Sequence, residues 1–192
     1  MSFESEMWGE MSVLQAAHAC ELLLKARIAQ EHPLLIFEQM PRLDGSAPLA
    51  LRDLAERGRT IAYAELPDRL FVTTGEQVPN VDQYLAFGRR RNSIQHFAPP
   101  SGVDCTRKTV EFVYGVIDPF INQMWGLFAV DHHEDYEPYE NLVAGLMMKE
   151  VEFLVSPGAA ADFSADPDTW TNVSDKYFKT MQTRHEHAKS LL

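Results

Sequence analysis

The amino-acid sequence predicts an all-α protein, and three observations support this prediction. Residues 10–30 contain neither Gly nor Pro and are rich in helix formers. Residues 104–128 place apolar side chains at helical spacing, at Val110, Val113, Ile117, Phe120 and Ile121. Turn residues separate such segments. With 192 residues and 45% hydrophobic residues, the chain is long enough to bury the core of one ordinary domain.

The elements of the first half follow from helix signals and turn residues. The first helix covers residues 10–30 and ends at Glu-His-Pro. Residues 34–48 mix a short apolar piece with turn residues and predict irregular structure. Three helical segments follow: one over residues 48–57 that Ser46 caps and Gly58 ends, a short one interrupted near Pro67 for which a strand at "RLFVTT" is the alternative, and one over residues 81–97 with Asn80 as its N-cap.

The second half predicts two long helices and a separate tail. The helices cover residues 104–128 and 138–155. The stretch "SPGAAADFSADPD" crowds Pro, Gly, Ala and Asp together, which is typical of a linker. A polar helix over about 168–190 follows it. We therefore expect a helical domain of residues 1–155, a linker of residues 156–167 and a loosely attached C-terminal helix of residues 168–192, which the core fold does not need.

Composition and charge restrict the classes of function. The net charge of −11 argues against a protein that coats nucleic acid non-specifically, because such proteins match phosphates with Lys and Arg. A nuclease with a small basic site remains possible, and Arg89, Arg90 and Arg91 form the densest positive patch. The apolar runs are far shorter than the roughly 20 residues of a membrane helix, and the start lacks the features of a signal peptide. Cys20 and Cys105 lack the neighbours of a zinc site, and a reducing, cytoplasmic location fits best.

The helix of residues 81–97 carries polar residues where apolar ones are expected. At about 100° per residue, Val81, Tyr84, Leu85, Phe87, Gly88 and Ile94 share one arc, and Arg89, Arg90 and Ser93 lie on the opposite, solvent side. Arg91, Asn92 and His96 fall on the apolar side. Burial of an unpaired Arg is costly, so these three residues need partners, a wet cleft or a ligand. They are either a structural network, with Arg91 paired to an acidic residue and His96 bonded to a carbonyl, or a functional site.

Two segments resemble the HEPN superfamily (higher eukaryotes and prokaryotes nucleotide-binding domains). The stretch "RNSIQH" matches its R-N-x-x-x-H motif on a late helix, through Arg91, Asn92 and His96. The stretch "AHACELLLKARIAQEHPLLIFE" is similar to the N-terminal helix of uncharacterised HEPN-like families. The resemblance covers roughly residues 10–155. Ala98 stands where one toxin branch carries a modifiable Tyr, so control by nucleotidylation of that Tyr is not expected.

The resemblance implies a metal-independent endoribonuclease of toxin–antitoxin or anti-phage type. His96 would act as base or acid near neutral pH, Arg91 would hold the phosphate, and Asn92 would orient the imidazole or bond the phosphate. Arg89 and Arg90 are candidates for substrate binding. The implied products are a 2′,3′-cyclic phosphate and a 5′-hydroxyl, without metal or cofactor. Implied partners are the RNA substrate, a second copy in a C2 homodimer with a composite site, and an antitoxin or defence-system protein, with no membrane. The alternative is a non-catalytic HEPN-like module that binds nucleotide, RNA or protein.

Other polar groups carry weaker signals. His18, Glu21 and Lys25 align on the first helix as a solvated stripe with a favourable Glu–Lys pair, or as positioning support for the Arg91/His96 site. The run "DHHED" at 131–135 reads as a solvated loop, because adjacent residues rarely converge on one ion. The same holds for "HEH" at 185–187, where neighbouring side chains diverge on a helix.

Overall fold

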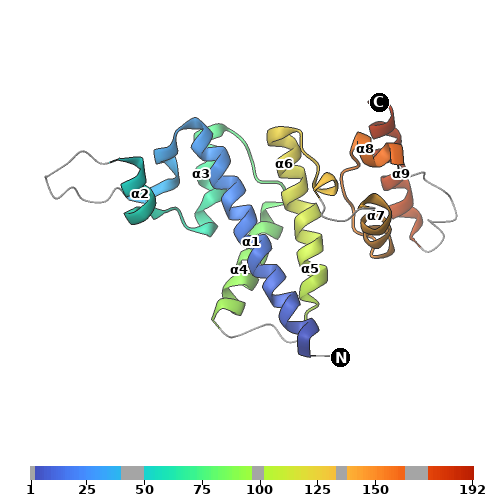
Figure 1. Ribbon diagram of the computed structural model, residues 1–192, viewed down its shortest axis with the longest axis horizontal. Coiled ribbons are helices and arrows are strands. Elements are labelled where there is room, and N and C mark those ends of the chain that lie inside the picture. Colours follow the sequence, from blue (N-terminus) through green and yellow to red (C-terminus); the bar gives the residue numbers. More distant parts are fainter. Residues whose placement is uncertain (1–2, 40–49, 97–101, 133–137, 163–172) are drawn as a thin grey trace, which may run out of the picture. The chain divides into compact units, whose positions relative to one another are not determined.

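The fold is predominantly helical, which confirms the all-α class (Figure 1). The computed structural model describes residues 3–39, 50–96, 102–132, 138–162 and 173–192. Two compact units are formed, Ala17–Val78 and the combination of Met1–Ala16 with Pro79–Leu192. Helix α1 (Phe3–Glu31) contributes its first part to the larger unit and its second part to the smaller one. No helix in the described part of the chain has the length and apolar character needed to cross a membrane.

The smaller unit combines short helices with a two-stranded ribbon. After α1 come η1 (Pro33–Ile36), β1 (Phe37–Gln39), α2 (Leu51–Arg57), β2 (Arg59–Thr60), η2 (Tyr63–Glu65) and α3 (Leu66–Thr74). The sequence His-Pro ends α1 as predicted, and the His32 side chain caps η1 by accepting a hydrogen bond from the Leu34 N–H at 3.2 Å. Strand β1 pairs antiparallel with β2, with Phe37 opposite Thr60. The core includes Leu24, Ile28, Ile61, Leu66 and Leu70.

Two predictions for this unit need correction. The range predicted as irregular contains η1 and the short strand β1 within its described residues. The strand alternative for "RLFVTT" is wrong, because these residues lie in α3. Pro67 stands in the first turn of α3, where its missing N–H costs no helical hydrogen bond, so it begins a helix here. Helix α2 ends before Gly58 as predicted, whereas Ser46 lies outside the described residues.

The larger unit holds the later helices of the chain. In chain order they are α4 (Val81–Gln95), α5 (Cys105–Phe112), the π-helical η3 (Val113–Ile117), α6 (Asp118–Trp125), η4 (Ala129–Asp131), α7 (Pro138–Met148), α8 (Pro157–Asp162) and α9 (Asp175–Lys189). The predicted helix of residues 104–128 is therefore α5, η3 and α6 in succession, and it ends at Gly126 in the left-handed conformation (φ 68°).

Proline explains why this long helix is not regular. Pro119 has no N–H to donate to the carbonyl of Gly115, four residues earlier, and its ring crowds that carbonyl. The wider turns of η3 relieve the crowding. The Asn80 side-chain amide donates a hydrogen bond to the Gly115 carbonyl oxygen at 2.6 Å. Asn80 was predicted to cap α4 with its side chain; it occupies the N-cap position (φ 48°), but its amide stabilises η3 instead.

The tail of the chain packs into the core of the larger unit. Helix α7 ends at Met148 rather than at residue 155, and Glu150 follows with a positive φ of 50°. Helix α8 lies inside the range predicted as a linker. Tyr177 and Met181 of α9 belong to one buried cluster with residues from η3, η4, α7, the segment after α7 and α8: Tyr114, Val130, Val143, Leu146, Met147, Val151, Phe153 and Ala159. The C-terminal helix is thus packed, not loosely attached.

Candidate functional site

The middle of α4 is fixed by apolar packing. Tyr84, Phe87 and Gly88 are buried, and the Phe87 ring stacks on Phe112 of α5 with 3.8 Å between ring centroids and 1° between planes. Val81 was predicted to belong to this face but is exposed. The middle of the apolar arc of α4, at Tyr84, Phe87 and Gly88, is therefore covered within the unit.

The last turns of α4 carry Arg91, Asn92 and His96. Arg91 continues the line of Tyr84 and Gly88 and is half-buried, whereas Asn92 and His96 are exposed. The prediction that all three lie on the apolar side is wrong for Asn92 and His96. A helical wheel gives the direction of a side chain, but the side chain is buried only where a neighbouring element packs against the helix at the same level along its axis. Beyond Gly88 no residue of α4 is buried.

Arg91, Asn92 and His96 nevertheless form a connected group. The Arg91 guanidinium donates through Nη1 to Oδ1 of Asn92 at 3.2 Å. The backbone N–H of His96, which is the C-cap residue, donates to the carbonyl of Asn92 at 3.1 Å. Within the described residues, no hydrogen bond or ion pair holds the His96 imidazole. The group thus offers an arginine fork, an amide and an exposed imidazole on adjacent turns. Pro99 and Pro100, the predicted helix stop, lie outside the described residues.

The two candidate substrate-binding arginines differ in their surroundings. Arg89 is exposed, as predicted. Arg90 was also predicted on the solvent side, but it is half-buried, and its Nε is buried without a hydrogen-bond partner among the described residues. Arg90 lies within electrostatic reach of Cys105 at the start of α5. Burial raises the pKa of the Cys105 thiol, and the charge of Arg90 opposes that rise.

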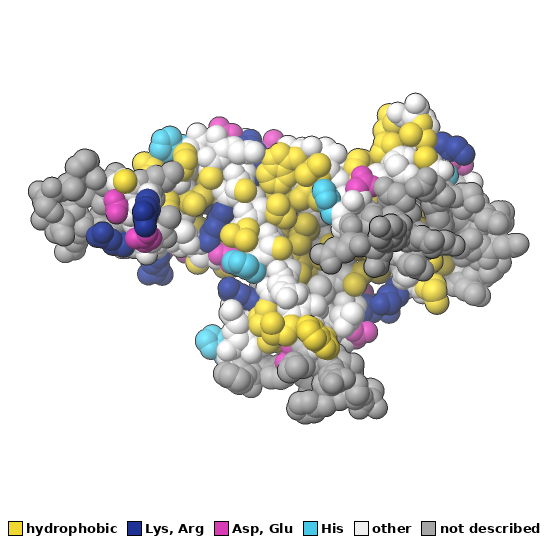
Figure 2. Space-filling model, in the orientation of Figure 1, with side chains coloured by type: hydrophobic (Ala, Val, Ile, Leu, Met, Phe, Trp, Pro, Cys, Tyr) yellow, Lys and Arg dark blue, Asp and Glu magenta, His cyan; other side chains and the backbone are white. Residues whose placement is uncertain are grey.

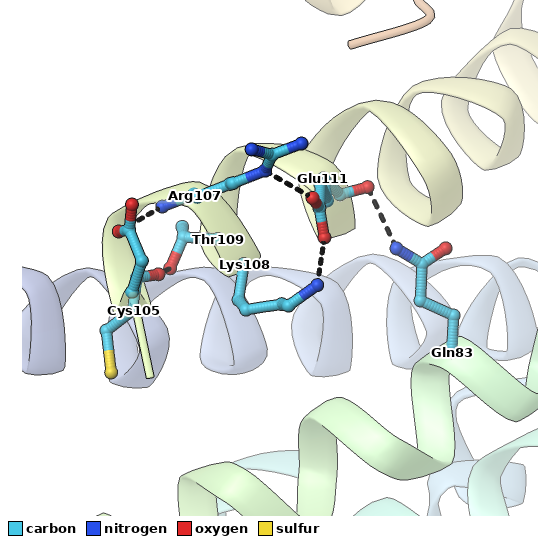
Figure 3. A network of polar contacts seen from close by, with 7 residues as sticks. Gln83, Cys105, Arg107, Lys108, Thr109 and Glu111 are labelled. Carbon is cyan, nitrogen blue, oxygen red and sulfur yellow. Dashed lines mark hydrogen bonds and ion pairs between the residues drawn. The ribbon is translucent and has the colours of Figure 1, made fainter. Parts of the chain in front are cut away.

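A polar network runs along α5 and reaches α4 through one side chain (Figure 3). Arg107 Nε and Lys108 Nζ donate to the two carboxylate oxygens of Glu111 at 2.9 and 2.6 Å. From α4, the Gln83 amide reaches the backbone carbonyl of Glu111 at 3.0 Å. Burial would raise the pKa of Glu111, but the hydrogen bonds from Lys108 and Arg107 outweigh it and lower that pKa. These cations are therefore already engaged within the protein.

The start of α1 packs closely on the start of α5. A Cβ on Gly9 would lie 3.3 Å from the Cβ of Cys105, so a side chain at this position would require Cys105 to shift by a few tenths of an ångström. The hydroxyls of Ser12 and Thr109 share a hydrogen bond of 2.9 Å. Arg90 also lies within electrostatic reach of Cys105, and the start of α1, the start of α5 and the end of α4 lie at the same end of the larger unit (Figure 1).

His18, Glu21 and Lys25 belong to the smaller unit, whereas Arg91 and His96 belong to the larger one. His18 is exposed. The predicted Glu21–Lys25 ion pair is confirmed at 2.5 Å, and Lys25 also donates to Thr60 at 3.0 Å. The side chains of Lys25 and Glu21 are only 12% and 16% exposed, so this pair is not part of a solvated stripe. A positioning role for these residues stays a prediction.

The described residues contain no group of three or more His, Cys, Asp or Glu side chains that could hold a metal ion. Residues 133–135 of the "DHHED" run lie outside them. Asp131 accepts a hydrogen bond from Ser156 at 2.5 Å, which is a structural contact. In "HEH", His185 is buried and His187 is exposed.

The sequence reading missed two structural polar groups, Asp118 and the Asn80 amide. The carboxylate of Asp118 is fully buried and accepts the backbone N–H groups of Ala129 and Leu154 at 2.8 and 2.9 Å. Asp118 directly precedes Pro119, and that unusual pair inside an apolar helix was the available signal.

The arginine fork and the imidazole at the end of α4 can bind an oxyanion and transfer a proton. Comparisons with protein-family models, with curated proteins and with solved structures found no match to this chain.

Proposed function

We propose that the protein is a metal-independent endoribonuclease of HEPN-like fold and of toxin–antitoxin or anti-phage type, working in the cytoplasm. The observation that carries the proposal is the R-N-x-x-x-H sequence at the end of α4, with Asn92 and His96 exposed and Arg91 bonded to Asn92. An exposed imidazole and a guanidinium on the last turns of one helix supply the groups that general acid–base chemistry on a phosphodiester needs.

The reaction needs no group beyond the RNA and the side chains. A base takes the proton of the 2′-OH, and the 2′-oxygen attacks phosphorus. The bond to the 5′-oxygen breaks, and an acid protonates that leaving oxygen. The products are a 2′,3′-cyclic phosphate and a 5′-hydroxyl. His96 takes or gives the proton. Arg91 stabilises the negative charge on the phosphate oxygens, and Asn92 holds Arg91 in place through its side-chain oxygen.

A homodimer would supply the second acid–base group. One His96 serves as base or acid in a given step, so a composite site at a C2 axis would provide both roles with two copies of His96. Packing of Tyr84 and Phe87 inside the unit removes one argument for such a dimer, namely that the apolar arc of α4 has to be covered. The need for a second acid–base group still favours a dimer. Mixing wild-type protein with an equal amount of His96→Ala protein would leave about one quarter of the activity for a composite site and about one half for independent sites.

The test of the proposal is RNA cleavage with and without EDTA. We expect cleavage in both conditions, with cyclic phosphate ends, and at least a 100-fold loss of rate for His96→Ala and for Arg91→Ala. Because His96 is exposed, the melting temperature of His96→Ala should stay within about 2 °C of the wild type. His187→Ala is the matched control, since His187 is also exposed near the end of a helix, and it should keep full activity. Full activity of His96→Ala would refute the catalytic role.

The net charge of −11 favours a second candidate, a non-catalytic HEPN-like module that binds nucleotide, RNA or a protein such as an antitoxin. Acidic proteins bind long polyanions weakly unless a local site compensates. Binding of RNA or of a partner with no product in either cleavage condition would support this candidate.

A further inference from the structure

Trp8 is an exposed aromatic side chain at the same end of the larger unit as the arginines of α4. Its exposed fraction is 68%, and Met11, one turn later on α1, is 42% exposed. The neighbouring residue Gly9 packs against Cys105. Burial raises the pKa of the Cys105 thiol, and the positive charge of Arg90 lies close enough to oppose that rise. Figure 2 shows hydrophobic side chains over the region where α1 begins, with Lys, Arg and His side chains near the end of α4.

The charges at this end of the unit are mixed. Arg89, Arg90 and Arg91 follow one another on α4, but Glu10 and Asp104 also lie within electrostatic reach of Cys105. Attraction for a phosphate backbone is therefore partly offset here, on a protein whose net charge is already −11. A nucleic acid bound at this end needs a contribution that does not depend on charge.

We infer that Trp8 is a stacking platform for an unpaired base of single-stranded RNA, whose phosphates lie on the arginines at the end of α4. This inference rests on the proposed function. An indole presents a flat face on which any base can stack, and such stacking depends little on the protein's net charge. Bases within a duplex are already stacked on each other, so a platform of this kind selects single strands. On α5, Arg107 and Lys108 are already paired with Glu111.

The experiment measures binding of a labelled single-stranded RNA whose riboses all carry 2′-O-methyl groups, so that the proposed cleavage cannot occur. We expect Trp8→Ala to weaken binding about tenfold and Trp8→Phe to retain most of it. A duplex of the same sequence should bind weakly, and Trp8→Ala should not change its affinity. Phe71→Ala is the matched control, because Phe71 is an exposed aromatic residue of the smaller unit (52%). It should bind single strands like the wild type.

The outcomes separate this inference from the proposed function. If Arg91→Ala weakens binding and Trp8→Ala does not, the stacking role is refuted and the proposed function stands. If the wild type neither binds nor cleaves RNA, both fail. Light scattering on the same variants tests the alternative that the exposed Trp8 is a contact between subunits. A change from dimer to monomer in Trp8→Ala would make Trp8 a subunit contact and would also refute the inference.

Discussion

The end of α4 and the C-terminal helix α9 are both polar helical segments, yet their polar groups have opposite surroundings. Around α9, the Tyr177 hydroxyl donates to the Val151 carbonyl at 2.8 Å, and Arg184 donates to the Phe153 carbonyl and to Glu152, both at 2.7 Å. At the end of α4, His96 and Asn92 are exposed. Polar composition therefore does not distinguish a helix whose polar groups are used in packing from one whose polar groups stay exposed; the position of the partners does.

Deletion of the tail should have the largest effect. A chain ending at Pro157 lacks Tyr177 and Met181, which are 4% and 1% exposed in the shared core. Loss of a large buried side chain typically costs about 2–5 kcal/mol, so removal of both approaches the whole stability of a domain. We expect the shortened chain to aggregate or to lose its cooperative thermal transition, measured by circular dichroism. A soluble shortened chain with an unchanged transition would show that the tail is dispensable, as its sequence suggested.

The contrast between these regions also explains what the sequence could predict. Helical periodicity located α1, α4 and the α5–α6 segment, because the spacing of apolar residues indicates a helix whichever element the helix packs against. Periodicity does not state which faces are covered. Asn92 and His96 were therefore assigned to the apolar side, whereas both are exposed. The tail was misread for the same reason. Tyr177, Met181 and Ala188 form a narrow apolar stripe in a mostly polar helix, and that stripe is enough to bury it.

The local breaks in helices follow from interactions that a single segment does not contain. The π-helical turns of η3 depend on Pro119 and on a side-chain amide from Asn80, which lies 35 residues before Gly115. The sequence shows Pro119, but it does not show that the Asn80 amide bonds the Gly115 carbonyl. For the candidate site, the motif identified Arg91, Asn92 and His96, whereas the half-burial of Arg90 and the contact of α1 with α5 at Gly9 arise only from the packing of helices.

A smaller effect is expected at Asp118, which ties α6 to the segments before and after α7. Asp118→Ala removes the acceptor for the Ala129 and Leu154 N–H groups, which costs about 2–4 kcal/mol by urea denaturation. Asp118→Asn keeps one acceptor oxygen and should cost less. Burial raises the pKa of Asp118 although both N–H groups oppose it, so ionisation is less favourable in the folded state. Its contribution to stability is greatest below the ordinary aspartate pKa and declines as pH rises through the raised pKa.

The ion-pair network of Glu111 should give the smallest effect and the opposite pH dependence. Its lowered pKa means that the carboxylate stabilises the folded state above the ordinary glutamate pKa of about 4.3. That stabilisation is lost as pH falls through the lowered pKa. Glu111→Gln should cost about 0.5–1 kcal/mol at pH 7, because partly exposed pairs with Arg107 and Lys108 are screened. The substitution leaves the backbone carbonyl that Gln83 contacts in place.

Urea denaturation at pH 7 and near pH 3 tests this prediction, with Glu56→Gln as the control. Glu56 pairs with Arg52 on α2, where the side chains are 57% and 87% exposed, so its substitution should have almost no effect at either pH. The cost of Glu111→Gln should shrink as the pH falls toward the lowered pKa of Glu111, since protonation weakens its attraction for both cations. An equal cost at both pH values would mean that the substitution acts through packing and not through charge.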